Sequence, residues 1–581
     1  MYRRNGITNA VQSNTNIKES PMEELLTINK AVYQLIQDFE SGNIAVPEIQ
    51  RDVVWKPDDI KGLIDSISQD FPCGSLILWQ PREKDKSYIR SIMRPERLEQ
   101  IRRSHGELPH YFLIDGQQRV TALASIMLDR GKLRELLAEM EEELPFIFVN
   151  LKRDFPHDTV ASTEAAGYKY PWVLFNDLFA AGKHIKGVSP EDTERLNQYA
   201  MKIRNYQFPI QIVKERKYVD VAEIFTRVNS AGTQLTGAEI HLAEIVPHWS
   251  GITRKFRDYR TQCMRMYYDI DLSFLMRAIT AIECKVPRVK ELVKRVRNKK
   301  LGHKRLDNHW KKAKSATDRL IRTLQRDLQL DKSKFFTSKN ALVPLVYYLA
   351  CDSGKRPAVR DVQRFFLLSQ LSEHYGGAAD TALSKDFRIL AGRNTVRQGL
   401  SDLVEAVDHE ARQSYRGLKI RPDHVYGVSS KNVLLLLMYV LMRRRGATDW
   451  DSGTGTTAKI KRLDEIGPEE MQLHHIFPFN FVHKNKAALK PYVDDGWTDA
   501  EIRAEINDIT NLTFLHQETN ASIGDKPPWQ YLPSFTDREM RKAHFIPDDP
   551  DLWKPENFQK FLNERQELLA KGMTSLLKSI S

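Results

Sequence analysis

The pattern of apolar residues along this 581-residue chain changes near residue 240. Before that point, helical stretches alternate with short β-rich runs, for example at residues 75–79 and 111–114. Strands interleaved with helices are typical of a mixed α/β domain. Beyond it, most segments up to about residue 425 carry apolar residues three or four positions apart, which predicts a helical region. A chain of this length should hold several domains, since one domain usually takes ~100 to 200 residues.

We therefore expect an α+β multidomain protein with four regions. They are a flexible polar arm at residues 1–24, an α/β domain at 25–240, a mostly helical middle at 241–425 and a helical C-terminal domain at 426–581. In the α/β domain we expect helices at 23–41 and 58–69, and one sheet with strands at 75–79, 111–114, 146–151 and 208–213. The apolar run at 433–442 predicts a helix in the last region.

Neither a membrane span nor a secretory signal is expected. The longest apolar run, at 433–442, has ten residues, whereas a membrane helix needs ~20. The polar start of the chain has no apolar stretch behind it. The four cysteines lie far apart and form no CxxC pair, so no zinc ribbon or disulfide framework is indicated. These features predict a cytoplasmic protein with reduced cysteines.

The charge of the chain is concentrated in one segment. Lys and Arg outnumber Asp and Glu by 88 to 76, an excess that suits a polyanionic partner. Residues 285–314 alone hold thirteen Lys or Arg against two acids. Such a run suits either a solvated helix face or nucleic-acid contact, and with Trp310 as its only aromatic residue, contact to backbone phosphates is the expected mode. The candidate contacts are Lys294, Arg295, Arg297, Lys299, Lys300, Lys304 and Arg305.

A strand-to-helix turn at residues 115–119, with the sequence DGQQR, is a candidate phosphate site. The first N–H groups of a helix lack internal partners and carry a partial positive charge, so an anion can sit on them. A glycine allows close approach, and an arginine fork suits phosphate oxygens. The residues concerned are Asp115, Gly116, Gln117, Gln118 and Arg119. The alternative is an ordinary turn whose arginine pairs with a nearby carboxylate.

The sequence LHHIFP places His474 and His475 side by side, and Asn511 and Asn520 follow. On a strand, adjacent side chains point to opposite sides, so one imidazole can face a metal while the other faces substrate. Phosphodiester hydrolysis needs a metal to neutralise charge on oxygen and a base to deprotonate water. A His-His pair alone is also common in a purely structural role.

Residues 25–240 resemble a known family through four ordered motifs. These are QR-x3-W, P-x-GS-x-IL-W, IDGQQR-x-TAL and IF-x-R-x-NS-x-GT-x-L, and they resemble the N-terminal domain of GmrSD-type, modification-dependent restriction systems. That domain is related to the ParB and sulfiredoxin-like fold. The resemblance implies that residues 115–119 bind and hydrolyse a nucleoside triphosphate of unspecified base, with Gln50 and Arg51 adding to the site.

The segment at about 465–530 resembles the ββα-metal nucleases of the HNH class, in the variant found at the C-terminus of GmrSD-type proteins. The resemblance implies that His474 and Asn520 bind a divalent metal and that His475 is the general base. It implies that Asn511 braces the loop and orients that base, and Lys526 is a candidate DNA contact. Many relatives have Asp in place of His474, so the imidazole should shift the metal preference from Mg²⁺ toward Mn²⁺, Ni²⁺ or Zn²⁺.

Together these features predict an anti-phage restriction endonuclease. It would sense foreign, modified double-stranded DNA, use the nucleotide at the DGQQR turn to regulate itself, and cut or nick DNA at the HNH site. A homo-oligomer or companion defence proteins are compatible partners. Two alternatives stay open: a ParB-like, nucleotide-switched DNA-binding regulator with a non-catalytic HNH remnant, and an HNH effector that cleaves RNA.

Overall fold

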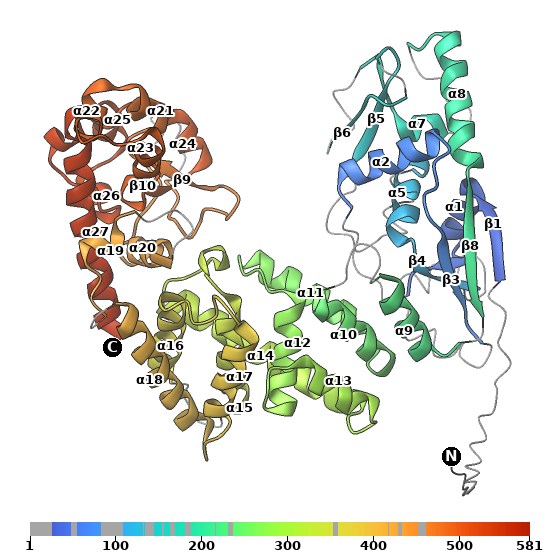
Figure 1. Cartoon of the computed structure of the whole chain (residues 1–581), viewed down its shortest axis with the longest axis horizontal. Coiled ribbons are helices and arrows are strands. Elements are labelled where there is room, and N and C mark those ends of the chain that lie inside the picture. Colours follow the sequence, from blue (N-terminus) through green and yellow to red (C-terminus); the bar gives the residue numbers. More distant parts are fainter. Residues whose placement is uncertain are drawn as a thin grey trace, which may run out of the picture. The chain divides into compact units, whose positions relative to one another are not determined.

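The computed structural model divides the chain into two compact units, Met1–Leu235 and Thr236–Ser581 (Figure 1). It describes residues 26–47, 55–82, 109–129, 131, 133, 145–153, 156–162, 169–179, 187–214, 216–229, 236–352, 358–415, 418–427, 433–450 and 460–580. The predicted arm at 1–24 and the predicted site residues Gln50 and Arg51 lie outside these residues. The boundary expected at about 240 lies close to the division at 235.

The described part of the first unit contains a five-stranded mixed sheet. Its order is β1 (Leu26–Ala31), β8 (Gln207–Lys214), β3 (Leu76–Gln80), β4 (Tyr111–Asp115) and β2 (Ile44–Ala45). The β3–β8 and β2–β4 pairs are parallel, and the other two pairs are antiparallel. The structure confirms the predicted strands at 75–79, 111–114 and 208–213, since apolar side chains from all three are buried in one core.

The helix predicted over 23–41 is wrong in its first half. Residues Leu26–Ala31 form the edge strand β1, which pairs with β8 from Leu26↔Ile212 to Ala31↔Gln207. The helix α1 begins only at Val32 and runs to Ser41, with Val32, Leu35, Ile36 and Phe39 buried. An available partner strand thus overrides the local helical pattern, as is common at sheet edges.

The strand predicted at 146–151 does form, but its predicted place in the main sheet is wrong. It is β5 (Phe146–Asn150), the centre of a separate three-stranded sheet with β6 (Thr159–Ser162) and β7 (Trp172–Leu174). Both sheets contribute to one apolar core. The described helices around it are α2 (Pro57–Ser68), α5 (Gln117–Met127), α7 (Phe175–Phe179), α8 (Pro190–Asn205) and α9 (Tyr218–Asn229).

The second unit starts with the helical region that the sequence predicts. Its helices are α10 (Gly237–Ile245), α11 (Ile252–Arg265), α12 (Leu272–Cys284), α13 (Val289–Arg297), α14 (His303–Asp327), α15 (Leu342–Cys351), α16 (Val359–Leu371), α17 (Ala379–Leu390), α18 (Val396–Ser414) and α19 (Pro422–Val425). Short 3₁₀ turns link several of them, at Val246–His248, Ser333–Phe335 and Lys339–Ala341. Buried apolar stripes at three- and four-residue spacing explain the helices.

The C-terminal part belongs to this same unit and places two short strands among helices. The strands are β9 (Met471–His475) and β10 (Leu512–His516). The helices are α20 (Val433–Arg444), α21 (Phe479–Lys484), α22 (Lys486–Asp494), α23 (Asp499–Ile506), α24 (Gln517–Ile523), α25 (Pro528–Phe535), α26 (Arg538–Ala543) and α27 (Phe558–Ile580). The structure confirms the helix predicted at 433–442. Among the helices described, none is long and apolar enough to cross a bilayer.

Candidate functional site

The two adjacent histidines lie on β9, which pairs antiparallel with β10 so that His475 faces Leu512 and His474 faces Thr513. Helix α24 follows β10 directly, which gives a strand–strand–helix order. Because neighbouring side chains on a strand alternate, the two imidazoles meet different surroundings. His474 is buried with 2% exposure, whereas His475 is partly exposed. One imidazole therefore lies in the interior and the other reaches the surface.

The structure brings the two predicted metal ligands into direct contact. His474 Nδ1 lies 2.7 Å from Asn520 Oδ1, across from β9 to the middle of α24. The Asn520 amide donates from Nδ2 to Gln472 Oε1 at 2.7 Å, which orients its oxygen toward the histidine. An imidazole nitrogen and an amide oxygen therefore lie close enough together to contact the same small ion.

The other nitrogen of His474 contacts a tyrosine that the sequence did not single out. Tyr531 Oη lies 3.2 Å from His474 Nε2 and donates to the carbonyl of Ile476 at 2.7 Å. Burial lowers the pKa of His474 to about 4, so this imidazole is neutral at pH 7. In the tautomer with its proton on Nε2, donated to Tyr531, the ring presents a lone pair at Nδ1, whereas in the other tautomer Nδ1–H donates to Asn520 Oδ1.

That lone pair faces Asn520 Oδ1, which is also an acceptor. Two acceptors at 2.7 Å repel each other unless a proton or a cation lies between them. The donor set of His474 and Asn520 thus fits a divalent cation. In the part of the chain that the structure describes, no group of three or more His, Cys, Asp or Glu side chains could hold a metal. A metal here would have two protein ligands, and water and phosphate would take the other positions.

His475 is held by Asn507, which lies between α23 and β10. His475 Nε2 lies 2.9 Å from Asn507 Oδ1, and Asn507 Nδ2 donates to the carbonyl of Arg503 at 2.7 Å. An amide oxygen accepts only, so Nε2 of His475 carries the proton and Nδ1 keeps a lone pair. Burial lowers the pKa of His475, which keeps the imidazole neutral and able to accept a proton.

Asn511 is fully buried and braces the loop that follows the two histidines. Its Oδ1 accepts from the backbone N–H of Phe477 at 2.9 Å, and its Nδ2 donates to the carbonyls of Phe477 and Ile506 at 3.0 and 2.9 Å. The amide that touches His475 is therefore Asn507, while Asn511 supports the backbone. No motif marked Asn507 in the sequence, although it stands only four residues before Asn511.

A buried arginine supports the same segment from the C-terminal helix α27. Arg565 is 0% exposed and donates from Nη1 to the carbonyls of Ile509 and Thr510, at 3.1 and 2.6 Å. Its Nη2 donates to the carbonyl of Leu512 at 2.7 Å. Burial lowers its pKa to about 9. This long-range contact ties the backbone around Asn511 to a helix about fifty residues away, which sequence patterns do not reveal.

Lys526, the predicted DNA contact beside this site, is exposed. Its Nζ donates to the carbonyl of Ser522 at 3.1 Å. The ammonium group has further donors that face solvent. It lies six residues after Asn520, beyond the end of α24.

The DGQQR turn has the predicted strand–turn–helix geometry. Gly116 is the N-cap of α5 with φ 94°, in the left-handed region. A Cβ at this position would lie 2.1 Å from Leu76 Cδ2, so both the backbone conformation and the space require glycine. The Oε1 atom of Gln117 is buried without a hydrogen-bond partner in the described structure. A buried, unsatisfied acceptor at a helix start is available to a donor from a ligand.

Arg119 is already paired inside the protein. Its Nη2 lies 2.9 Å from Asp115 Oδ2, and its Nη1 donates to the carbonyl of Cys73 at 2.6 Å. The alternative expected from the sequence, an arginine paired with a nearby carboxylate, is thus present. A phosphate would have to compete with Asp115 for the guanidinium. Gly74 packs against this arginine, because a Cβ there would lie 2.7 Å from Nη1.

Three of the four N-terminal motifs meet at this turn. The backbone N–H of Trp55 donates to Gln118 Oε1 at 3.2 Å, and Cys73 and Gly74 contact Arg119. A cavity of about 930 Å³ lies beside the same Cys73–Gly74 segment, and Lys202 and Tyr206 also line it. Its volume is in the range of nucleotide-sized pockets. Trp79 is fully buried against Phe112 and Tyr218.

The basic segment at 285–314 divides into paired and unpaired cations. Arg295 and Arg305 both bind the buried carboxylate of Glu283, at 2.7 and 3.0 Å. Arg297 pairs with Glu244 at 2.8 Å, and Lys294 pairs with Glu291 at 3.1 Å. Lys299, Lys300 and Lys304 are exposed, and no carboxylate of the described residues pairs with them. Part of the predicted DNA contact set therefore has an internal electrostatic role.

Two comparisons with known proteins match this chain, one over residues 32–246 and the other over nearly its whole length. Residues 32–246 match the family model described as the N-terminal domain of the GmrSD restriction endonuclease. This match covers 215 of the 581 residues, so the similarity concerns the N-terminal part of the chain. An uncharacterized protein of Methanocaldococcus jannaschii is 21% identical over 95% of this chain and 100% of its own length.

Proposed function

We propose that this chain is a GmrSD-type restriction enzyme that hydrolyses DNA phosphodiesters at the site on β9, β10 and α24. The observation that carries the proposal is the convergence of His474 Nδ1 and Asn520 Oδ1 at 2.7 Å, next to a neutral His475. These are a two-ligand donor set, from β9 and α24, and a base on β9. The ParB-like relation of the first unit, and the HNH class of this site, are part of the proposal.

The metal would be held by His474 and Asn520 and would neutralise charge on the phosphate oxygens. The imidazole ligand favours Mn²⁺, Ni²⁺ or Zn²⁺ over Mg²⁺. His475 Nδ1 accepts a proton from the attacking water, because its Nε2–H is held by Asn507. The Asn507 oxygen then stabilises the imidazolium that forms. Asn511 and Arg565 keep the connecting backbone in place throughout.

The DGQQR turn is the proposed nucleoside triphosphate site, with Gln50 and Arg51 as further members. Its support is the open helix start at Gly116, the unsatisfied Gln117 oxygen and the adjacent cavity. Because Arg119 already pairs with Asp115, a bound triphosphate would compete with Asp115 for the Arg119 guanidinium group. A triphosphate would take Arg119 from Asp115, so the occupancy of the site changes the local ion pairing.

The substrate we propose is foreign, modified double-stranded DNA, such as phage DNA. The support is the match to a restriction-endonuclease family together with the exposed cations Lys299, Lys300, Lys304 and Lys526. Lysines without a carboxylate partner are free to contact phosphates. Oligomers and companion defence proteins belong to the same proposal as partners.

A cleavage assay tests this function. The purified full chain is incubated with unmodified DNA, modified phage DNA and RNA, each with Mg²⁺ or Mn²⁺ and with each nucleoside triphosphate. We expect metal-dependent cleavage of modified DNA that a nucleotide changes in rate. Cleavage of RNA alone would favour an RNA-directed effector. DNA binding without any cleavage under all conditions would favour a nucleotide-switched regulator.

A further inference from the structure

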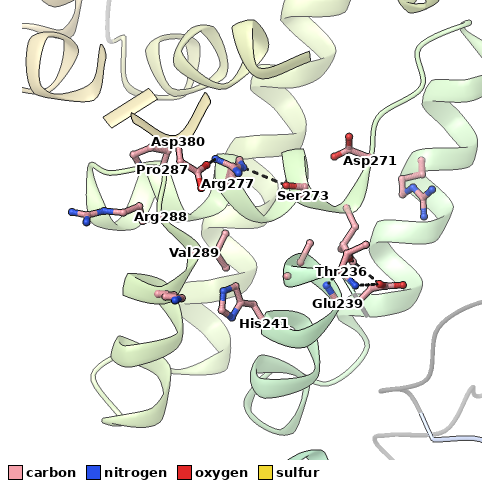
Figure 2. Close-up of a pocket in the computed structure, with 15 residues that line it drawn as sticks. Thr236, Glu239, His241, Asp271, Ser273, Arg277, Pro287, Arg288, Val289 and Asp380 are labelled. Atoms are coloured by element: carbon pink, nitrogen blue, oxygen red, sulfur yellow. Dashed lines mark hydrogen bonds and ion pairs between the residues drawn. The ribbon is translucent and has the colours of Figure 1, made fainter. Parts of the chain in front are cut away.

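A second cavity lies in the helical part of the second unit, apart from both sites described above. It has a volume of about 720 Å³ and is bordered by the first residues of α10, α12 and α13, with α11 and α17 beside them (Figure 2). Leu272, Pro287 and Val289 form an apolar part of its wall. Among the described residues that line it, His241 carries the one aromatic ring. The apolar part of the wall offers a surface on which a sugar can pack.

Each carboxylate that lines this cavity accepts hydrogen bonds or forms an ion pair within the protein. Glu239 accepts from the backbone and the hydroxyl of Thr236, at 2.7 and 2.8 Å, and Asp271 caps α12 through the N–H of Phe274 at 2.7 Å. Asp380 pairs with Arg277 at 2.5 Å. Figure 2 shows Arg277 reaching toward Asp380 and Ser273. Only Asp380 is neutralised by an ion pair, so Glu239 and Asp271 keep their negative charge, and the four Arg and Lys residues that line the cavity outnumber its three carboxylates by one.

Several of the Arg and Lys side chains that line the cavity keep donors that are not used in contacts within the described residues. Arg260 uses Nε for the carbonyl of Ile270 at 3.1 Å, which leaves its other donors. Arg288 and Lys290 border the cavity at the start of α13, are exposed, and have no side-chain hydrogen bond or ion pair within the described residues. Arg288 extends outward at the rim in Figure 2. The charge left over at the cavity is therefore positive.

The backbone adds to this potential. The helices α10, α12 and α13 all begin at the cavity, with N-caps at Thr236, Asp271 and Arg288. The first two N–H groups of each helix have no partner inside it, and each helix start carries a partial positive charge. Three such starts around one cavity reinforce the field of the side chains.

We propose that this cavity receives the sugar–phosphate backbone of a DNA strand, with a phosphate at Arg288 and Lys290 and the sugar against the apolar wall. The unpaired lysines Lys299 and Lys300 lie beyond the other end of α13. Nine residues of helix span about 14 Å, so one ligand that meets both ends of α13 must be a polymer rather than a free nucleotide. The inference rests on the proposed function in one respect, which is that the substrate is DNA.

The test is the salt dependence of DNA binding by the full chain, measured without cleavage in the absence of added divalent metal. The double variant Arg288→Ala/Lys290→Ala should reduce the slope of log Kd against log salt by about 2, because each phosphate contact contributes about 0.9. The matched control Lys571→Ala/Lys578→Ala removes the same charge from exposed positions on α27 and should leave the slope unchanged.

A second pair of variants tests whether DNA binding needs the volume of the cavity, rather than the positive charge around it. Gly237 borders the cavity and has open space around an added Cβ, so Gly237→Leu should fold, fill part of the cavity and weaken DNA binding several-fold. Gly62→Leu, at an equally open position on α2, is the control and should not weaken it. A free nucleoside triphosphate and inorganic phosphate serve as competitors and should not displace DNA from this cavity.

The outcomes separate this inference from the proposed function. If the wild type binds and cleaves DNA but the Arg288/Lys290 and Gly237 variants behave like their controls, the cavity is not a backbone site and the function stands. If the wild type binds no DNA, both fail. Displacement of DNA by free nucleotide, lost in the Arg288/Lys290 variant, would assign the cavity to a small ligand and overturn the inference.

Discussion

Tyr531 is the side chain that decides which nitrogen of His474 is free. Its hydroxyl donates a hydrogen bond to the carbonyl of Ile476 and accepts from Nε2 in the Nε2–H tautomer, which leaves Nδ1 for a metal. Partners of this kind typically change metal affinity by about 10- to 100-fold when removed. We expect Tyr531→Phe to weaken Mn²⁺ binding by that factor, measured by calorimetry and by the Mn²⁺ dependence of cleavage.

The control for this prediction is Tyr492→Phe, which removes a hydroxyl from an equally buried tyrosine that contacts Glu505 instead. It should leave Mn²⁺ affinity unchanged. Equal losses in both variants would mean that general destabilisation, rather than the orientation of His474, explains the effect of Tyr531→Phe.

Glu505 gives the site region a pH-dependent stability. Burial raises its pKa to about 7, and the nearby Asp508 adds to the shift. The folded state then binds a proton more tightly than the unfolded state, so the free energy of unfolding falls as pH rises from about 4.5 through 7. A shift of this size corresponds to roughly 3 kcal/mol at most.

We therefore expect Glu505→Gln to raise the unfolding temperature at pH 8 and to have little effect at pH 5. Thermal unfolding of both proteins at the two pH values measures this. Glu564→Gln makes the same charge change at an exposed position on α27 and should show no such pH dependence. A Glu505→Gln gain that is the same at both pH values would refute the account.

At the scale of elements, the turn that begins α5 depends on glycine. In Gly116→Ala, the new methyl group would meet Leu76, and φ 94° is strained for alanine. Such positions cost about 1 to 3 kcal/mol, so we expect a lower unfolding temperature and weaker nucleotide binding. Gly62→Ala, inside α2 with open space, should instead stabilise by roughly 0.5 to 1 kcal/mol. Effects of the same sign in both variants would contradict this interpretation of the turn.

Local patterns predicted most elements, and long-range contacts account for the differences. The DGQQR strand and helix and the helices of the middle region follow from residue periodicity. Residues 26–31 became a strand because β8 lies beside them, and β5 joined a second sheet, neither of which a local pattern contains. Likewise, Arg295 and Arg305, two of the predicted DNA contacts, form ion pairs with Glu283. The fold brings these residues together, so the sequence pattern does not reveal the ion pairs.

The candidate site shows the same contrast between what local patterns predict and what long-range contacts add. The structure places His474 and Asn520, the two metal ligands that the resemblance implies, 2.7 Å apart, while their role as ligands stays a prediction. Asn507 and Tyr531, which set the protonation of the two histidines, belong to no motif and appear only when α23 and α25 pack beside β9.

For the whole molecule, the account requires energetic coupling between the nucleotide site in the first unit and the nuclease site in the second. A nuclease carried in a cell needs such control. Arg119→Ala removes the group that a triphosphate and Asp115 would share, so nucleotide hydrolysis should be lost and both DNA cleavage and phage restriction should change. Parallel assays of all three activities measure this. Wild-type cleavage and restriction by a variant without hydrolysis would show that the two sites are uncoupled.

The central claim is that His475 removes a proton from water at a metal site on β9 and α24. The direct measurement is the single-turnover rate of DNA cleavage with saturating Mn²⁺, for the wild type, His475→Ala and Asn507→Ala, together with the Kd for DNA. We expect His475→Ala to slow cleavage by ~10² to 10⁴ with Kd nearly unchanged, and Asn507→Ala to slow it by a smaller factor. Cleavage by folded His475→Ala at the wild-type rate would contradict the account.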